Sequence, residues 1–324
     1  MDSKTNLDLK PVGMVTIDVE PDNVWANTQS QTYENIKFLP NFHALCSEFG
    51  IRPTYLVSWS IANNAHCSNI LENLLNKGNC EIGIHPHLWE TPAKIAQDTS
   101  EHAWVGLDYA ESALNDKIEN LVNLIAKQFG RPVSHRAGRW GLDLRQVSIL
   151  QSHGIEVDTS VIPGIDWSST GILDHTCAPI APYFIGSDGI FDTGSSGLLE
   201  VPCTIRPGLK ILGLETNKYV RRIIGRLGFG HEWLRASPIM SPEKMIHISK
   251  WAIEQLTHLN LMSHSSEFMP SGSPYWKSQA DIEKQFQMFR KLFSYWQVSG
   301  VRAMTLAEFS SEHKLHAHKV KTHE

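Results

Sequence analysis

Short apolar runs alternate with amphipathic stretches along most of this chain. The apolar runs are four to six residues long, and we expect each to form a buried strand. They lie at residues 12–17, 54–58, 80–84, 155–158, 198–203, 259–263 and 301–304. Apolar residues at helical spacing lie at 33–49, 68–76, 108–129, 142–153, 241–258 and 281–298. Strands that alternate with helices predict a parallel β/α barrel, whose chemistry collects at the C-terminal ends of the strands.

Glycine and proline mark where several predicted helices begin, divide or end. Gly50 follows the helix at 33–49 as a C-terminal cap, and Pro40 is expected to kink or divide that helix. Residues 241–243 read Ser-Pro-Glu, which is the pattern of an N-cap, a proline at the first helical position and an acidic first turn. These signals support the helical assignment of both stretches.

Two long segments break the alternation. Residues 164–197 are rich in Gly, Pro, Ser and Asp and predict an ordered surface excursion, and a second excursion is expected at about 205–240. Within it, residues 210–235 interleave six basic side chains with apolar ones. This suits peripheral contact with a membrane or an amphipathic helix packed on the barrel, and we favour the packed helix. We expect one barrel domain over residues 1–310 and a polar, His-rich, disordered tail over 311–324.

Composition and charge narrow the class of protein. Of the 324 residues, 41% are hydrophobic and 19% are charged, as in a globular protein with a sizeable core. A formal net charge of −5 argues against a nucleic-acid binder. Residues 1–10 lack the apolar core of a signal peptide, and no run approaches the roughly 18 apolar residues of a spanning helix. We therefore expect a cytoplasmic protein, free or at the inner membrane surface. Its five scattered cysteines favour reduced thiols.

Two carboxylates follow the first predicted strand. Asp18 and Glu20 lie two residues apart, and side chains alternate along a strand, so the pair shares one face. A metal ligand and a general base would suit this position. A helix cap or a solvated turn at Pro21 explains the two residues equally well when they are taken alone.

Two histidines follow the third predicted strand. His85 and His87 point to one side by the same rule, and two imidazole ligands suit a zinc-type ion. A catalytic zinc site then needs one further protein ligand and an open position for water. The chain has 16 histidines, so a chance pair in a surface turn is the better explanation of these two alone.

Later strand ends carry further polar side chains. Arg136, Arg139 and Trp140 lie in a Gly-rich turn after a short strand, and an arginine there would keep a nearby carboxylate ionised and oriented. His264 ends the strand at 259–263, where an imidazole can act as a general acid. Singly, a surface arginine and a core histidine are the simpler interpretations. The order of acids, histidine pair, arginine and histidine at successive strand ends favours a functional site.

In that order the clusters resemble the motifs of the polysaccharide deacetylases, carbohydrate esterase family 4, from about residue 13 to residue 308. Residues 16–20 are similar to the acidic motif, as an Asp-x-Glu variant where most members have adjacent Asp residues. His85-Pro-His87, followed by Trp89 and a Thr-Pro pair, resembles a subgroup from cell-envelope polysaccharide and lipopolysaccharide gene clusters. Most of the family would place the second histidine where Trp89 stands. Residues 136–141, 158–163 and 261–264 resemble the Arg motif, the Asp-x-x-x-x-Pro element and the final His motif.

The resemblance implies a distorted (β/α)7 barrel and a deacetylase that depends on a divalent metal ion, Zn²⁺ by preference. It implies Asp18 as general base, Glu20, His85 and His87 as metal ligands, Arg136 as the residue that orients the base, and His264 as general acid. Because the two acids are not adjacent, the division of the base and ligand roles between Asp18 and Glu20 stays open.

The implied substrate is an N- or O-acetylated carbohydrate, from a cell-envelope or extracellular polysaccharide or its sugar precursor. We expect substrate contacts from Trp59, Trp89, Arg139, Trp140 and Asp158, with Trp276 as a further stacking candidate. For at least half of the tryptophans, core packing is the better interpretation.

Two other functions stay open on the sequence. A glycoside hydrolase of a related barrel would use Asp18 or Glu20 with a second acid to cleave a glycosidic bond. A non-catalytic barrel with an incomplete metal site would bind a glycan or a biosynthetic partner, and the altered histidine spacing motivates this alternative. Release of acetate would favour the deacetylase, and release of reducing ends would favour the glycoside hydrolase. About one equivalent of bound zinc would distinguish the deacetylase from the non-catalytic barrel.

Overall fold

The structure is a computed structural model that describes residues 10–22, 24, 31–93, 109–208, 230–255 and 258–321. Its first elements are β1 (Val12–Val19), η1 (Glu34–Phe38), α1 (Leu39–Glu48), β2 (Thr54–Val57), α2 (Trp59–Ala62), α3 (Ala65–Leu75), β3 (Glu81–Ile84), α4 (Glu111–Phe129), β4 (Ser134–His135), η3 (Gly138–Trp140), α5 (Leu144–Ser152) and β5 (Val157–Asp158). There follow η4 (Ser168–Thr170), β6 (Tyr183–Phe184), β7 (Leu199–Glu200), β8 (Ile205–Arg206), β9 (Glu232–Trp233), α7 (Pro242–Gln255), β10 (His258–His264), η6 (Ser265–Phe268), α8 (Gln279–Val298), β11 (Arg302–Ala303) and α9 (Leu306–Lys321). The predicted strands and helices are confirmed, and the helix at 33–49 is divided beside Pro40.

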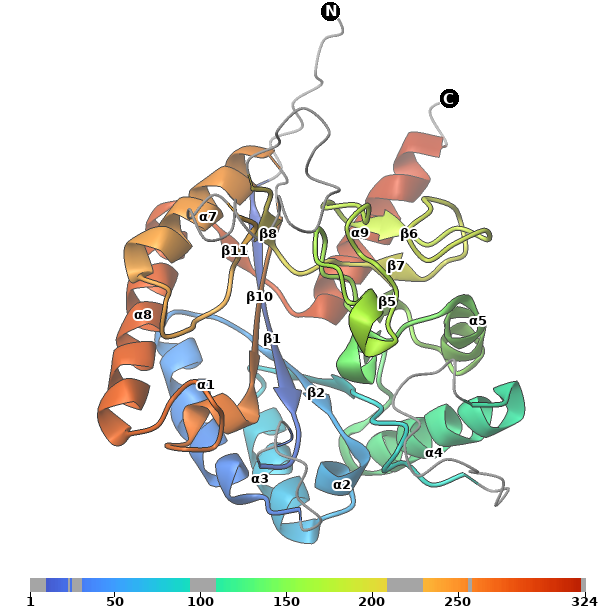
Figure 1. The fold of residues 1–324 in the computed structure, drawn as a ribbon, viewed down its shortest axis with the longest axis horizontal. Helices are drawn as coiled ribbons and strands as arrows, with labels where there is room; N and C mark the ends of the chain where they lie inside the picture. The colour runs from blue at the N-terminus through green and yellow to red at the C-terminus, as the bar shows by residue number, and fades with distance from the viewer. Residues whose placement is uncertain are drawn as a thin grey trace, which may run out of the picture.

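Nine strands form one curled sheet surrounded by helices (Figure 1), and β8 and β9 form a separate antiparallel pair. The strand order in the curled sheet is β10-β1-β2-β3-β4-β5-β7-β6, with β11 beside β1. Every pairing in this sheet is parallel except that of β6 with β7. The run from β10 to β7 is therefore an uninterrupted series of parallel strands, and α-helices join β1 to β5 in turn as the sequence predicts.

Asn260 in β10 joins the two ends of this parallel series. The backbone N–H of Thr204, which lies beyond β7, donates to the carbonyl oxygen of Asn260 at 3.1 Å. The backbone N–H of Asn260 donates to Oγ1 of Thr204 at 2.8 Å, and its side-chain amide donates to the carbonyl oxygen of Val201 at 3.1 Å. The sheet is therefore closed between β10 and the segment after β7 by these hydrogen bonds, without a regular β-ladder. This is the distorted barrel that the sequence predicts.

The parallel register sets the ends of the strands side by side. Asp18 at the end of β1 is paired with His264 at the end of β10. His135 at the end of β4 is paired with Ile84 of β3 and with Asp158 of β5. The polar residues at and beyond these positions are therefore brought to one end of the barrel.

An aromatic cluster holds the helices next to that end. Phe42 of α1 stacks on Phe268 of η6, with 4.2 Å between the ring centroids and 11° between the ring planes. Phe289 of α8 meets the edge of Phe42, with 5.4 Å between the centroids. All three side chains are buried. This packing fixes η6, the short 3-10 helix that directly follows the last polar strand end.

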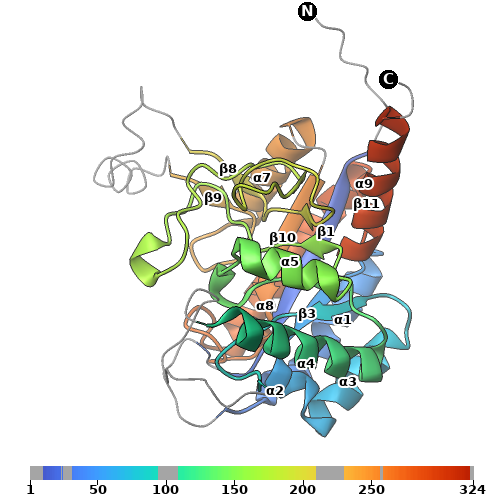
Figure 2. The ribbon, with the colours of Figure 1, turned by 90° about the vertical axis from the view of Figure 1, so that its right-hand side faces the viewer.

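The chain beyond residue 310 was expected to be disordered, and that prediction is wrong for the described part of it. Helix α9 continues to Lys321 and packs beside β1 and β5, and Figure 2 shows it at the edge of the barrel. Leu306 and Phe309 are buried, and the ring of His313 lies 5.6 Å from that of Phe309. These residues are spaced by three and four, so they form one helix face whose packing outweighs the polar composition.

The first predicted excursion, at 164–197, is irregular but contains η4 and β6. Of the second, residues 209–229 lie outside the described residues, so the membrane contact predicted for 210–235 stays a prediction. In the part of the chain that the structure describes, no helix is both long enough and apolar enough to cross a bilayer.

His175 ties the first excursion to the barrel through a hydrogen bond that needs a neutral imidazole. The backbone N–H of Ile162 donates to Nδ1 of His175 at 3.1 Å. Burial lowers the pKa of His175 to about 4, although Asp174 and Asp158 act in the opposite direction. The unfolded chain takes up this proton near pH ~6.5, so the free energy of unfolding falls as the pH drops from about 7 toward 4.

A His175→Asn variant keeps an acceptor for the Ile162 N–H but cannot titrate. Between pH 7.5 and pH 5.0 we expect the wild type to lose about 2 kcal/mol more unfolding free energy than this variant, as measured by urea denaturation. Equal losses in the two proteins would show that His175 is not buried in its neutral form.

Candidate active site

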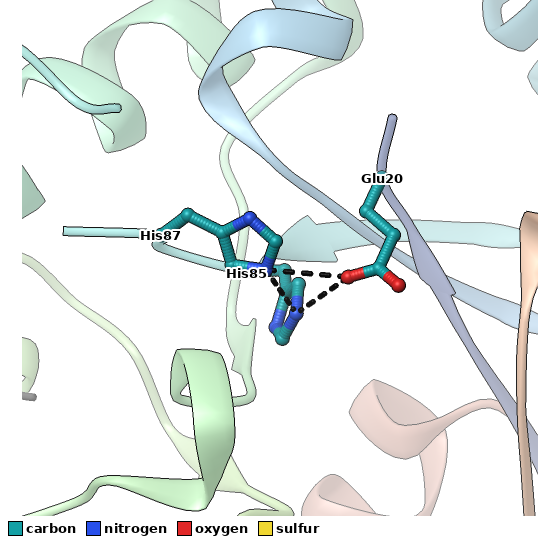
Figure 3. A group of neighbouring side chains, drawn as sticks. All are labelled: Glu20, His85 and His87. Carbon is teal, nitrogen blue, oxygen red and sulfur yellow. Dashed lines mark hydrogen bonds and ion pairs between the residues drawn. The ribbon is translucent and has the colours of Figure 1, made fainter. Parts of the chain in front are cut away.

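Glu20, His85 and His87 each direct one ligand atom toward a common point (Figure 3). The Nε2 atoms of the two histidines are 3.1 Å apart, and Oε2 of Glu20 lies 3.2 Å from Nε2 of His87 and 3.7 Å from Nε2 of His85. Ligand atoms at ~2.1 Å from a tetrahedral zinc ion lie about 3.4 Å from each other. All three side chains are buried. The predicted ligand set therefore converges, and its spacing fits one zinc-type ion.

Backbone and charge prepare these groups to bind a cation. Nδ1 of His85 lies 2.8 Å from the carbonyl oxygen of Arg136, so Nδ1 carries the proton and the Nε2 lone pair faces Glu20. Burial raises the pKa of Glu20, but His264 and the two ligand histidines outweigh it and hold that pKa well below its usual range. Glu20 is therefore an ionised carboxylate that faces the Nε2 atoms of both histidines.

Arg136 holds the second carboxylate of the acidic motif. Its guanidinium is fully buried and donates from Nη1 to Oδ1 of Asp18 at 2.6 Å, while Nε donates to the carbonyl oxygen of Thr159 at 2.9 Å. The other oxygen of Asp18, Oδ2, lies 3.8 Å from Nε2 of His85 and 3.7 Å from Nε2 of His264. The arginine thus fixes one oxygen of Asp18 and leaves the other facing the site.

His264 lies across the site from the histidine pair and is oriented by residues that the sequence reasoning missed. Its Nδ1 lies 2.9 Å from Oε1 of Glu267, which also forms an ion pair with Arg235. Burial raises the pKa of Glu267, but Arg235 and His264 outweigh it, and the pKa is lowered. Nε2 of His264 faces Asp18 and Glu20, at 3.7 and 3.8 Å. The available signal was a His-x-x-Glu spacing, which fits one turn of helix.

A strained turn carries the predicted arginine and tryptophan of the Arg motif. Arg139 and Trp140 both adopt left-handed backbone conformations, with φ of 55° and 61°, which non-glycine residues rarely do. Gly138 packs so closely on the preceding loop that an added Cβ would lie 2.7 Å from the carbonyl oxygen of Pro86. The Trp140 ring then lies under the guanidinium of Arg136, 5.1 Å from its centroid. Such strain at a site edge is typical of a functional turn.

Aromatic rings line the edge of the site. Trp89 stacks on His87, with 4.4 Å between the ring centroids and 19° between the planes, and the guanidinium of Arg139 lies 5.6 Å from the Trp89 centroid. Trp140 meets Trp233 of β9 edge to face at 5.7 Å. Trp233 was not predicted, because it lies far along the chain, beyond the second excursion. Trp89, Arg139 and Trp140 therefore lie where a substrate contact is expected, and they stay proposals for that role.

Two other predicted substrate contacts are fully buried, and a third is partly buried. Trp276 is only 1% exposed and packs in the core, so it cannot stack on a sugar. Asp158 has no exposed surface and bonds to His135 and Ser160, so its placement does not support a substrate contact. Trp59 begins α2 and is partly buried against the core, and its contact with substrate stays a prediction.

These positions predict opposite phenotypes for two tryptophans. Trp276→Ala should lower the free energy of unfolding by about 3–5 kcal/mol, because it leaves a cavity in the core. Trp140→Ala, at a partly exposed ring, should cost less stability but slow the reaction, because the ring supports Arg136. Urea denaturation and steady-state rates of the folded variants check both. A Trp276→Ala protein of normal stability would contradict its placement.

No family model matches the sequence, and no curated protein matches it. Solved structures do match the fold. A Mycobacterium smegmatis protein assigned as a polysaccharide deacetylase has a TM-score of 0.55 at 13% identity, covering 95% of this chain and 92% of that one. A Parabacteroides distasonis protein assigned as a glycoside hydrolase or deacetylase has a TM-score of 0.56 at 13% identity, covering 94% and 71%. A 4-alpha-glucanotransferase from Thermococcus litoralis has a TM-score of 0.50 at 14% identity, covering 93% and 40%.

These identities are too low to transfer an activity, but the likeness extends over nearly the whole chain. It agrees with the curled parallel sheet and with the order of polar strand ends. The chain therefore has the fold of the polysaccharide deacetylases, the distorted (β/α) barrel that its sequence predicts.

Proposed function

We propose that the protein is a metal-dependent hydrolase that removes an N- or O-linked acetyl group from a carbohydrate. One observation carries the proposal. The ligand-like group of Glu20, His85 and His87 lies beside a carboxylate, Asp18, and an imidazole, His264, each held in place by a buried partner. Acyl-group hydrolysis by a metal ion needs these parts, namely three ligands, a base and an acid.

Glu20, His85 and His87 would hold the ion. Two imidazole nitrogens and one carboxylate oxygen suit Zn²⁺, which when bound polarises the acyl carbonyl and lowers the pKa of a water molecule. We infer from the convergence of Glu20 with the histidines that Glu20 is the ligand and Asp18 the base. Asp18 also lies near His85, but its oxygen is 3.8 Å away and its partner oxygen is engaged by Arg136.

The chain's own residues then move the protons. Oδ2 of Asp18 accepts a proton from the attacking water, while Arg136 orients the carboxylate through its other oxygen. Nε2 of His264 donates a proton to the departing amine or alkoxide, and Glu267 orients the ring by accepting the Nδ1–H. Trp89 and Trp140 give the sugar ring apolar faces beside the reacting bond. The His-x-His motif with its following Trp and Thr-Pro supports a cell-envelope polysaccharide, or its sugar precursor, as the substrate.

Cleavage of a glycosidic bond is the second candidate, because two neighbours of the fold are a protein assigned as a glycoside hydrolase or deacetylase and a glucanotransferase. That chemistry uses two carboxyl groups that flank the bond, ~5 Å or more apart. Here Glu20 converges with His85 and His87 as a ligand-like group, so it and Asp18 do not serve as a pair of carboxyl groups that flank a glycosidic bond. The geometry therefore favours acyl transfer to water.

The test is product analysis on acetylated oligosaccharides, with N-acetylated and O-acetylated sets compared. We expect acetate release that stops after chelation and returns with added zinc, and no new reducing ends. Reducing ends without acetate would favour the glycoside hydrolase. A protein that binds no metal and releases neither product would be the non-catalytic barrel.

A further inference from the structure

Two fully buried carboxyl groups lie side by side behind Arg136. Asp158 is at the end of β5 and Glu200 at the end of β7, and the two are register partners in adjacent parallel strands. Neither side chain has any exposed surface. Two negative charges at this position would repel each other without water to screen them, so their hydrogen bonds decide which one is ionised.

The hydrogen bonds are unequally divided. Asp158 accepts from Nδ1 of His135 at 2.5 Å, and from the backbone N–H and the hydroxyl of Ser160 at 2.9 and 2.8 Å. Glu200 accepts from the backbone N–H of Val161 on Oε1 at 3.0 Å. No N–H or O–H group of the described residues donates to its buried Oε2. An ionised oxygen there would be costly, whereas a protonated one has an acceptor in Asp158.

The pKa shifts of the two acids agree with this difference in their hydrogen bonds. Burial and the neighbouring Asp158 raise the pKa of Glu200 well above its usual range. Burial also raises the pKa of Asp158, but hydrogen bonds from Glu200 and His135 outweigh it and lower that pKa. One proton on Glu200 and a negative charge on Asp158 therefore satisfy both groups.

The Asp158 carboxylate holds the residues on both sides of Arg136. It bonds directly to His135. It also bonds to the hydroxyl of Ser160, which in turn accepts the backbone N–H of Ala137 at 2.8 Å. Residues 135 and 137 are thus both fixed to the end of β5, and the residue between them has little freedom to move.

Arg136 in turn contacts both Asp18 and His85. Its side chain donates to Asp18 at 2.6 Å, and its backbone carbonyl accepts from Nδ1 of His85 at 2.8 Å. A shift of this one residue would therefore disturb the carboxylate assigned as base and the orientation of a metal ligand together. Groups at this distance from a metal often set its affinity.

We propose that Glu200 acts as a neutral hydrogen-bond donor to Asp158, and that this buried acid pair positions Arg136 and, through it, both Asp18 and His85. The inference rests on the proposed function in taking His85 as a metal ligand and Asp18 as the base. Asp158 and Glu200 are positioning residues, since neither reaches the site itself.

The test compares Glu200→Gln, Glu200→Ala and Asp158→Asn for zinc affinity, by competition with a chelator, and for kcat of acetate release. A glutamine amide also donates a hydrogen bond, so Glu200→Gln should stay within about 3-fold of the wild type in both. Glu200→Ala and Asp158→Asn should each weaken zinc binding and lower kcat by roughly 10–100-fold. Thermal denaturation and circular dichroism verify that each variant is folded.

Glu81→Gln is the matched control. Glu81 is a second largely buried carboxylate, at the start of β3, and it accepts hydrogen bonds from Thr54 and from the backbone N–H of Ala307. An amide there faces donors, so stability should fall while zinc affinity and kcat of the folded protein stay unchanged. The contrast separates a general burial effect from positioning of Arg136.

The proposal is overturned if Glu200→Gln is impaired as strongly as Glu200→Ala, or if folded Asp158→Asn matches the wild type. Should Asp158→Asn fail to fold, Ser160→Ala decides, because it removes the hydroxyl that links Asp158 to the backbone N–H of Ala137. Wild-type zinc affinity and kcat in that variant would overturn the proposal. If the wild type releases no acetate, the proposed function fails, yet the zinc affinities still rank the variants and test the positioning role by themselves.

Discussion

Replacement of His87 by alanine is expected to remove metal binding and to lower kcat/KM for acetate release by at least ~10³-fold. Nε2 of His87 is the atom closest to both other ligand atoms, at 3.1 Å from His85 and 3.2 Å from Glu20. A zinc ion left with two protein ligands binds weakly, and the several kcal/mol of transition-state stabilisation that it supplies are lost with it. Metal content by elemental analysis and acetate release measure the two effects.

His66→Ala is the control for that experiment. His66 is an exposed histidine of α3, remote in sequence from the polar strand ends, and its replacement should leave about one equivalent of zinc and full activity. A His87→Ala protein that retained stoichiometric zinc would disprove the ligand assignment. One that lost its zinc but kept its activity would disprove metal-dependent hydrolysis.

Asp18→Asn is expected to lower kcat by about 10²- to 10⁴-fold while zinc stays bound. The amide keeps the shape of the side chain but cannot take a proton from water. Zinc stays because Glu20 and the two histidines form the ligand set without Asp18. Glu20→Gln should have the opposite signature, with weakened zinc binding. The pair of variants thereby decides which acid of the Asp-x-Glu motif is base and which is ligand.

Asp22→Asn is the matched control, since it makes the same change in the same segment. Asp22 accepts the backbone N–H groups of Glu34 and Asn35 at 2.8 and 2.9 Å and so supports the start of η1. Its replacement should lower stability but leave kcat and zinc content unchanged. If Asp18→Asn protein lacked zinc and Glu20→Gln protein retained it, the two roles would have to be exchanged.

The alternation of apolar runs and helical stretches was enough to predict the barrel. Short continuous apolar strands with helices between them allow few arrangements other than a parallel sheet. In a parallel barrel all strands end on one side, so Asp18, His85, Arg136 and His264 could be predicted to meet without any knowledge of the loops. Glu20 and His87 lie one and three residues beyond the ends of β1 and β3, and they converge at the same end of the barrel for the same reason.

Only the tertiary structure decided what surrounds that site. Glu200 and Asp158 lie 42 residues apart and become partners through the register of β5 with β7. Arg235 and Trp233 reach the site because β9 folds back on β8. Trp276 looks like its surface counterparts in the sequence but packs in the core. Local pattern determines which element a residue joins and which face it takes, because those depend on near neighbours. Pairings between distant segments depend on how the elements pack, and no local pattern contains that information.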